Sequence, residues 1–196
     1  HIHDRRQRQM CIRDSRRPGL DAHLAADVRF VVQSDASYIV AMTNSHKTPV
    51  LPGDTFDAVI VGAGFTGLYM LHVLRQKGFT ARLVDAASGV GGTWYWNRYP
   101  GARCDIESMQ YSFQFSEELQ QEWEWTERYA SQPEILAYIE HVADRFDLTR
   151  DIQFDTRVEA ATFNEDTGVW IVETDRGQTL HARYFIMGVG CLSAPI

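Results

Sequence analysis

The chain has 196 residues, enough for one domain with a sizeable core. Its hydrophobic share of 44% and charged share of 23% are ordinary for a globular protein, and its net charge of −7 argues against a dedicated nucleic-acid-binding protein. The cysteines Cys11, Cys104 and Cys191 form no C-x-x-C pair and there is no long apolar run, so we expect a cytoplasmic protein without a disulfide framework, structural metal or membrane segment.

Residues 1–55 differ in character from the rest of the chain. The first 17 positions contain six arginines and show no helical or strand periodicity. A basic nucleic-acid arm would have this composition, but a flexible or non-native leader explains it more simply. We therefore assign residues 1–55 to a leader, with Met42 as a possible native start, and residues 56–196 to the folded domain.

The region from Asp57 to Asp85 predicts a strand, a glycine turn, a helix and a second strand. Residues 57–61 are an apolar run typical of a buried parallel strand, and residues 81–84 form another. Between them, Gly62, Gly64 and Gly67 give the spacing G-x-G-x-x-G. In dinucleotide-binding folds these glycines permit the tight turn, the close approach of a pyrophosphate and the packing of helix on strand.

Asp85 follows the second strand, where such folds place the carboxylate that binds an adenosine ribose. A carboxylate there repels a 2′-phosphate, so this first site suits FAD or NAD and disfavours NADP. The alternative is a glycine turn that binds no nucleotide, because G-x-G-x-x-G alone is a weak signal.

Residues 86–116 show little regular pattern but are rich in aromatic side chains, among them Trp94, Tyr95 and Trp96. Next to a glycine pair, such side chains suit a flat, wide ligand. Packing within a core or domain interface is an equally good reading of the residues alone.

The second half of the chain predicts two helices followed by strands. Residues 117–125 have the pattern of a short amphipathic helix, and a capping box at residues 131–134 opens a longer helix that ends near residue 146. Strands are expected at residues 152–154, 157–163, 169–174, 178–182 and 184–189. The fold class is therefore α/β: a Rossmann-like domain with a parallel sheet, a crossover helix and a small antiparallel meander.

The segment GGTWYWNRYPGARCD, residues 91–105, carries a family resemblance. It matches the pattern A/G-G-x-W-x-x-x-R-Y/F-P-G/M-x-x-x-D and resembles the type I Baeyer–Villiger flavin monooxygenases, in particular the phenylacetone and cyclohexanone monooxygenase branch. The likeness continues through residues 105–148 and to RYFIMGVGCLSAP, so that it covers residue 56 to the end.

The resemblance implies a set of residues that bind FAD and NADPH. The glycine turn with Phe65 and Thr66 would hold the pyrophosphate, and Asp85 would hold the ribose. The family more often has glutamate at the position of Asp85. Tyr111 would contact FAD, and Val158 would meet the adenine. Arg103, Cys104 and Asp105 would face the flavin and the nicotinamide, with Asp105 in a catalytic role because it orients the arginine that stabilises the peroxide. The implied cofactor-binding set is Gly62, Gly64, Phe65, Thr66, Gly67, Asp85, Gly92, Thr93, Trp94, Tyr95, Trp96, Arg103, Cys104, Asp105, Tyr111 and Val158.

The resemblance further implies an NADPH-dependent enzyme that inserts one oxygen atom of O2 next to a ketone carbonyl through a C4a-peroxyflavin. The chain contains no second G-x-G-x-x-G and no F-x-G-x-x-x-H-x-x-x-W fingerprint. We therefore expect an incomplete FAD-binding portion of such an enzyme, inactive alone, with ketone and O2 as partners and no nucleic acid or membrane. A related monooxygenase that hydroxylates nitrogen or oxidises sulfur, and a stand-alone FAD- or NAD-binding module, are the alternatives.

Overall fold

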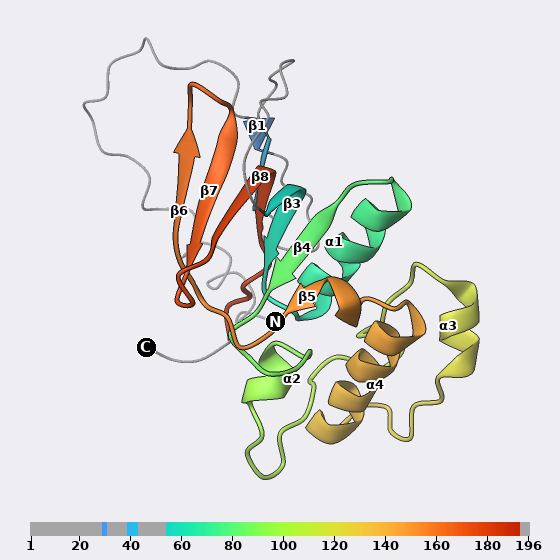
Figure 1. The fold of residues 1–196 in the computed structure, drawn as a ribbon. Coiled ribbons are helices and arrows are strands. Elements are labelled where there is room, and N and C mark those ends of the chain that lie inside the picture. Colours follow the sequence, from blue (N-terminus) through green and yellow to red (C-terminus); the bar gives the residue numbers. More distant parts are fainter. Residues whose placement is uncertain (1–28, 31–38, 43–53, 193–196) are drawn as a thin grey trace, which may run out of the picture.

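The computed structural model describes residues 29–30, 39–42 and 54–192, and its strands form one mixed sheet (Figure 1). Along the sheet the order is β1-β2-β8-β3-β4-β5, and β6 and β7 extend it as a hairpin on β8. Strands β8, β3, β4 and β5 are parallel, as the βαβ pattern predicted. The Rossmann-like fold with an added antiparallel meander is confirmed.

The first βαβ unit positions everything that follows. Strand β3 (Thr55–Val61) leads through the glycine turn into helix α1 (Phe65–Gln76), and β4 (Ala81–Val84) returns parallel to β3. Alternate residues of β3 face opposite sides: Ala58 and Ile60 pack with α1, whereas Val59 joins a second apolar cluster. A strand buried on both faces needs the continuous apolar run that the sequence shows.

Strand β8 (Thr179–Met187) corrects one expectation. The sequence predicts two strands here, residues 178–182 and 184–189, but the chain runs as one nine-residue strand. Its first half pairs antiparallel with β7 (Val169–Thr174), and its residues from His181 to Met187 pair in parallel with β3. Arg183, which lies between the two predicted strands, is exposed, and the strand continues through it.

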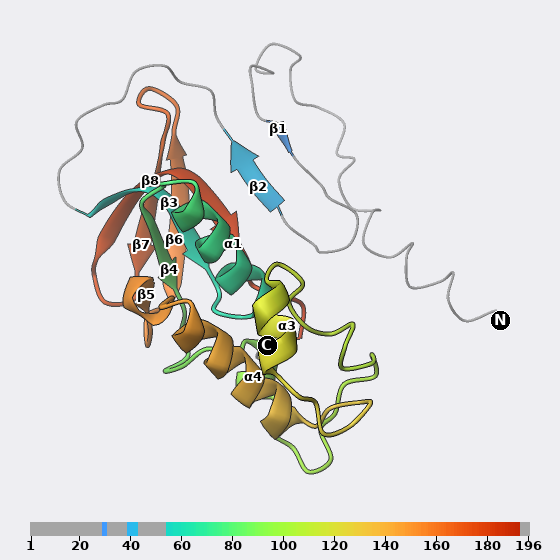
Figure 2. The same cartoon turned by 90° about the vertical axis from the view of Figure 1, so that its right-hand side faces the viewer.

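The two faces of the sheet are covered by different layers. Helix α1 lies on one side, in front of the strands in Figure 2, and helix α4 (Gln132–Arg145) lies below them and shares an apolar cluster with α1. On the other side, β6 (Val158–Asn164) and β7 form the meander, whose apolar residues pack on Val59, Val84 and Phe185. Strand β5 (Ile152–Gln153) follows a 3₁₀ turn, Thr149–Asp151, at the edge beside β4.

The helices between β4 and β5 differ in detail from prediction. A short helix α2 (Thr93–Trp96) lies inside the region without regular pattern, and α3 (Glu117–Glu122) is shorter than expected. Helix α4 begins after Ser131, but the predicted capping box does not form. The Ser131 side chain makes no capping hydrogen bond, and Glu134 instead accepts a hydrogen bond from the Thr126 amide at 2.7 Å.

Two short strands fall within the range assigned to the leader. β1 (Arg29–Phe30) pairs with β2 (Ile39–Met42), and β2 pairs antiparallel with β8 from Phe185 to Met187. These six residues belong to the sheet, which the composition of residues 1–55 did not predict. Residues 54 and 55 are also described, and Thr55 begins β3; the remaining residues of the predicted leader lie outside the described ranges, and the division at residue 55 stays a prediction.

Candidate functional site

A cleft with a volume of about 520 Å³ opens at the carboxyl ends of β3, β4 and β8. This is the edge of an open parallel sheet at which ligands of such folds bind. The predicted residues that line the cleft are Gly62, Gly64, Phe65, Thr66, Asp85, Gly92, Thr93, Trp94, Trp96, Tyr111 and Val158. Residues up to 96 positions apart in the sequence, from Gly62 to Val158, therefore meet at one site.

The glycine turn is shaped by backbone contacts that no side chain fits. Gly62 has φ +102°, and a Cβ on it would lie 2.5 Å from the Gly188 carbonyl oxygen. A Cβ on Gly67 would lie 1.8 Å from the Gly62 carbonyl oxygen, so Gly67 lets α1 pack onto the turn. A Cβ on Gly64 would have the Gly92 Cα as its nearest neighbour, at 3.5 Å. That face of the turn is therefore open to the cleft.

The beginning of α1 adds positive electrostatic character to this open face. Its N-cap residue Gly64 has no side chain to cap the first amides, and the first turn contains no acidic residue. Uncapped amides and the positive end of the helix dipole attract anions, with a dipole contribution of roughly 0.3–2 kcal/mol. A phosphate group therefore fits where Gly64, Phe65 and Thr66 line the cleft.

Asp85 ends β4 at the cleft, but its carboxylate already has partners. Oδ2 accepts a hydrogen bond from the Ala63 amide at 2.5 Å, and Oδ1 accepts one from the Ala87 amide at 2.7 Å. The side chain thus ties β4 to the glycine turn. A carboxylate has further lone pairs and can still accept from a ribose hydroxyl, but the short aspartate side chain is held back towards the protein.

The aromatic wall of the cleft is fixed by hydrogen bonds. The indole N–H of Trp94 donates to the Tyr111 hydroxyl at 3.1 Å, and the buried Gln132 amide donates to the Trp94 carbonyl at 2.5 Å. Burial raises the pKa of Tyr111, although the Trp94 hydrogen bond acts in the opposite direction. Tyr111 therefore stays protonated at neutral pH and offers a neutral, partly apolar surface to a ring system.

Five predicted residues do not line the cleft: Gly67, Tyr95, Arg103, Cys104 and Asp105. Tyr95 turns to Ser88, with 2.6 Å between the two hydroxyls. Arg103 pairs with Glu127 at 2.5 Å and donates to the Tyr129 carbonyl. Cys104 is buried, and burial raises the pKa of its thiol. Asp105 is exposed, so its predicted catalytic role stays a prediction.

The cleft also contains residues that the sequence did not single out. They come from the strand ends and from the start of the meander: Val61, Ala86, Gly91, Thr156, Arg157, Gly188, Val189 and Gly190. The glycines after β8 carried a signal, because G-V-G at the end of an apolar strand resembles the first glycine turn. Thr156 and Arg157 had no such signal, since only the tertiary fold brings them beside Asp85.

No group of three or more His, Cys, Asp or Glu side chains within residues 54–192 has the geometry to bind a metal ion. None of the helices in the described ranges has the length and apolar character needed to span a bilayer.

The fold and the cleft together define a dinucleotide-binding Rossmann-like domain. Residues 60–124 match the family described as "NAD(P)-binding Rossmann-like domain". This class fits the glycine turn and the uncapped helix described above.

Comparison with characterised proteins narrows the class. A Baeyer–Villiger monooxygenase from Pseudooceanicola batsensis is 53% identical over 143 residues, which are 72% of this chain and 26% of the relative. The phenazine N-monooxygenase PhzNO1 from Lysobacter antibioticus is 49% identical over 139 residues, 70% of this chain and 26% of that protein. The chain is homologous to a segment of the Baeyer–Villiger and related flavin monooxygenases, and it spans about a quarter of their length.

Solved structures give the same result. The oxidised steroid monooxygenase bound to NADP superimposes with a TM-score of 0.69 at 61% identity, covering 69% of this chain and 26% of that one. The structure titled OTEMO in complex with FAD and NADP superimposes with a TM-score of 0.69 at 42% identity, covering 72% of this chain and 26% of that one. The predicted resemblance to Baeyer–Villiger monooxygenases is confirmed.

Proposed function

We propose that the cleft binds FAD and that the chain forms the flavin-binding part of an NADPH-dependent monooxygenase. The observation that carries the proposal is the turn at Gly62 and Gly64, which leaves an open, uncapped helix start facing a cleft walled by Trp94 and Tyr111. The diphosphate fits the helix start and the flat ring fits the aromatic wall. The FAD-containing relative supports this choice of dinucleotide.

The reaction we propose is the insertion of one oxygen atom of O2 next to a ketone carbonyl, which yields an ester or lactone. FAD, when bound, supplies the redox chemistry that activates oxygen. The chain's own part is to bind and orient the cofactor and to keep water from its ring. The buried Trp94 and the partly buried Tyr111, which stays neutral, suit that task because neither brings a charge to the ring.

A second candidate reaction is oxygen transfer to a ring nitrogen. It is favoured by the 49% identity to the phenazine N-monooxygenase, which is only a little lower than the identity to the Baeyer–Villiger relative. The two reactions share the flavin site and differ in the substrate pocket. Both take a small organic molecule, O2 and NADPH, and neither uses a nucleic acid.

A pair of chimeras tests in which of the two relatives this flavin-binding segment supports catalysis. The 143 matching residues of this chain would replace their counterpart in the Pseudooceanicola batsensis enzyme, and the purified chimera would be assayed with NADPH and a simple ketone. We expect it to retain FAD and to form ester. The matched control carries the same segment in the phenazine N-monooxygenase and is assayed for N-oxide. A Baeyer–Villiger chimera that holds FAD but forms no ester, beside an active N-oxide control, would reverse the assignment.

A further inference from the structure

Arg157 lies at the edge of the cleft, and its guanidinium has no partner among the residues that the structure describes. Each other arginine within residues 54–192 has its guanidinium in an ion pair, a hydrogen bond or contact with an aromatic ring. For Arg157 the only hydrogen bonds in this part of the chain are made by its backbone. The side chain is exposed and lines the cleft.

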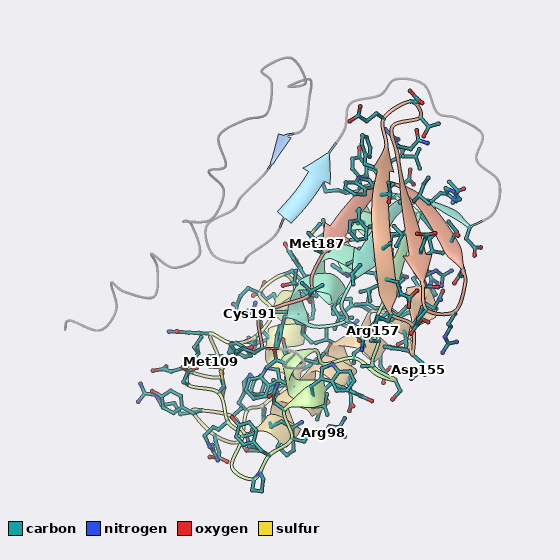
Figure 3. The ribbon with its side chains drawn as sticks, turned by 90° about the vertical axis from the view of Figure 1, so that its left-hand side faces the viewer. Arg98, Met109, Asp155, Arg157, Met187 and Cys191 are labelled. Atoms are coloured by element: carbon teal, nitrogen blue, oxygen red, sulfur yellow. The ribbon has the colours of Figure 1, made fainter. Side chains whose placement is uncertain are left out.

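The backbone at Arg157 is held rigidly. The Arg157 amide donates to Asp175 Oδ1 at 2.9 Å, and the Asp175 amide donates to the Arg157 carbonyl at 2.9 Å. The preceding residue, Thr156, is fully buried and donates its amide to the Asp85 carbonyl at 2.9 Å. The side chain of Arg157 therefore starts from a fixed point beside the carboxyl end of β4. Figure 3 shows Arg157 and Asp155 at the end of the meander that faces the helical part of the molecule.

The charges that line the cleft indicate that Arg157 can balance the negative charge of a ligand. Asp85 and Arg157 are the only charged side chains among the described residues that line it. The two backbone amides that bond to Asp85 already compensate its carboxylate. A dinucleotide brings two negative phosphates, of which the helix start offsets part. Arg157 is thus the one side chain of the described lining that can supply a counter-charge.

We propose that Arg157 recognises the adenosine-side phosphate of the bound dinucleotide and so makes the cleft prefer ligands with an adenosine diphosphate half. The inference rests on the proposed FAD site and names a binding residue within it. These folds place the adenosine at the end of β4. Thr156, the neighbour of Arg157, is hydrogen-bonded to Asp85 at that end. A planar guanidinium with five N–H donors suits a phosphate better than an ammonium does, and its weak hydration lowers the cost of binding.

The test is a titration of the full chain and its Arg157→Gln variant with FAD, ADP and riboflavin, followed by flavin fluorescence or, for ADP, by competition. We expect the Arg157→Gln variant to bind FAD and ADP roughly five- to tenfold more weakly. This is the loss of affinity expected when one exposed, charge-assisted contact to a phosphate is removed. Riboflavin, which lacks the phosphates, should bind both proteins equally. The difference in FAD affinity between the wild type and the variant should become smaller as the ionic strength rises from about 0.05 M to about 0.5 M, because salt screens the charge of Arg157.

Two further variants make the result specific. Arg157→Lys keeps the charge and should recover most of the lost affinity. Arg183→Gln removes an equal charge from an exposed residue of β8 outside the cleft, and should bind FAD like the wild type. If Arg157→Gln binds FAD within twofold of the wild type at low salt, the inference is wrong while the flavin site stands. If the wild type binds ADP but no flavin, the proposed function fails first.

Discussion

Replacing Gly64 with alanine separates folding from cofactor binding. The Gly64 backbone has φ −88° and ψ −168°, a region open to any residue. A Cβ there would lie 3.5 Å from the Gly92 Cα and 3.9 Å from the Gly92 nitrogen, which are ordinary van der Waals distances. The free energy of unfolding should therefore be unchanged or rise by about 0.4–1 kcal/mol, because alanine restricts the unfolded chain.

The same methyl group stands on the face of the turn that a pyrophosphate must approach. An extra methyl in a close-packed contact costs about 1–3 kcal/mol, which corresponds to a roughly five- to hundredfold weaker affinity. Urea unfolding measures the first effect, and FAD titration followed by flavin fluorescence measures the second.

Gly62→Ala is the matched comparison. Its Cβ would meet the Gly188 carbonyl oxygen at 2.5 Å, and the residue has φ +102°, so this variant should lose stability and binding together. A Gly64→Ala protein that folds normally and binds FAD as tightly as the wild type would refute the placement of the phosphate.

Two other predictions concern stability. Asp155 has φ +51°, and its side chain makes no hydrogen bond within the described part of the chain. Asp155→Val should therefore destabilise the protein by about 1–2 kcal/mol in urea, whereas Asp155→Asn should stay within about 0.5 kcal/mol. His72 packs against Phe115 and Phe146, and burial, followed by the charge of Arg75, lowers its pKa below the ordinary 6.5. The folded state therefore favours neutral His72: its contribution is complete above pH 6.5 and is lost as the pH falls through the lowered pKa. His72→Phe should flatten the fall in Tm on acidification, and an unchanged slope would contradict this.

The glycine turn and its βαβ unit could be predicted because local chemistry and global fold agree there. The apolar runs of β3 and β4 and the three glycines each admit few alternatives, and the structure places all of them as expected. The tryptophan-rich segment was predictable as a wall of the site through the family pattern, since its residues alone left core packing open.

Other features depend on tertiary contacts that a pattern does not contain. The sequence predicts two strands, one on each side of Arg183, yet pairing with β3 and β7 holds this stretch as the single strand β8. Residues 131–134 match the sequence pattern of a capping box, but the Glu134 carboxylate accepts a hydrogen bond from the Thr126 amide instead. Arg157 enters the cleft only because Thr156 is tied to the end of β4 by a hydrogen bond between residues 71 positions apart.

Asp85 lies at the predicted place, but its carboxylate has partners that the sequence did not predict. The acid lines the cleft, as the spacing predicted, but its carboxylate bonds to the amides of Ala63 and Ala87. A longer glutamate would reach further into the cleft. In this structure the observed hydrogen bonds of the Asp85 carboxylate are to the backbone beside the glycine turn, and its binding of a ribose stays a prediction.

Titration of the purified full chain with FAD is the most direct measurement, with NAD and NADP as parallel ligands. The account predicts saturable one-to-one binding of FAD, with flavin fluorescence quenched by the neighbouring tryptophans, and weaker binding of the two nicotinamide dinucleotides. A folded protein that does not bind FAD, or that binds NADP more tightly than FAD, would contradict the account.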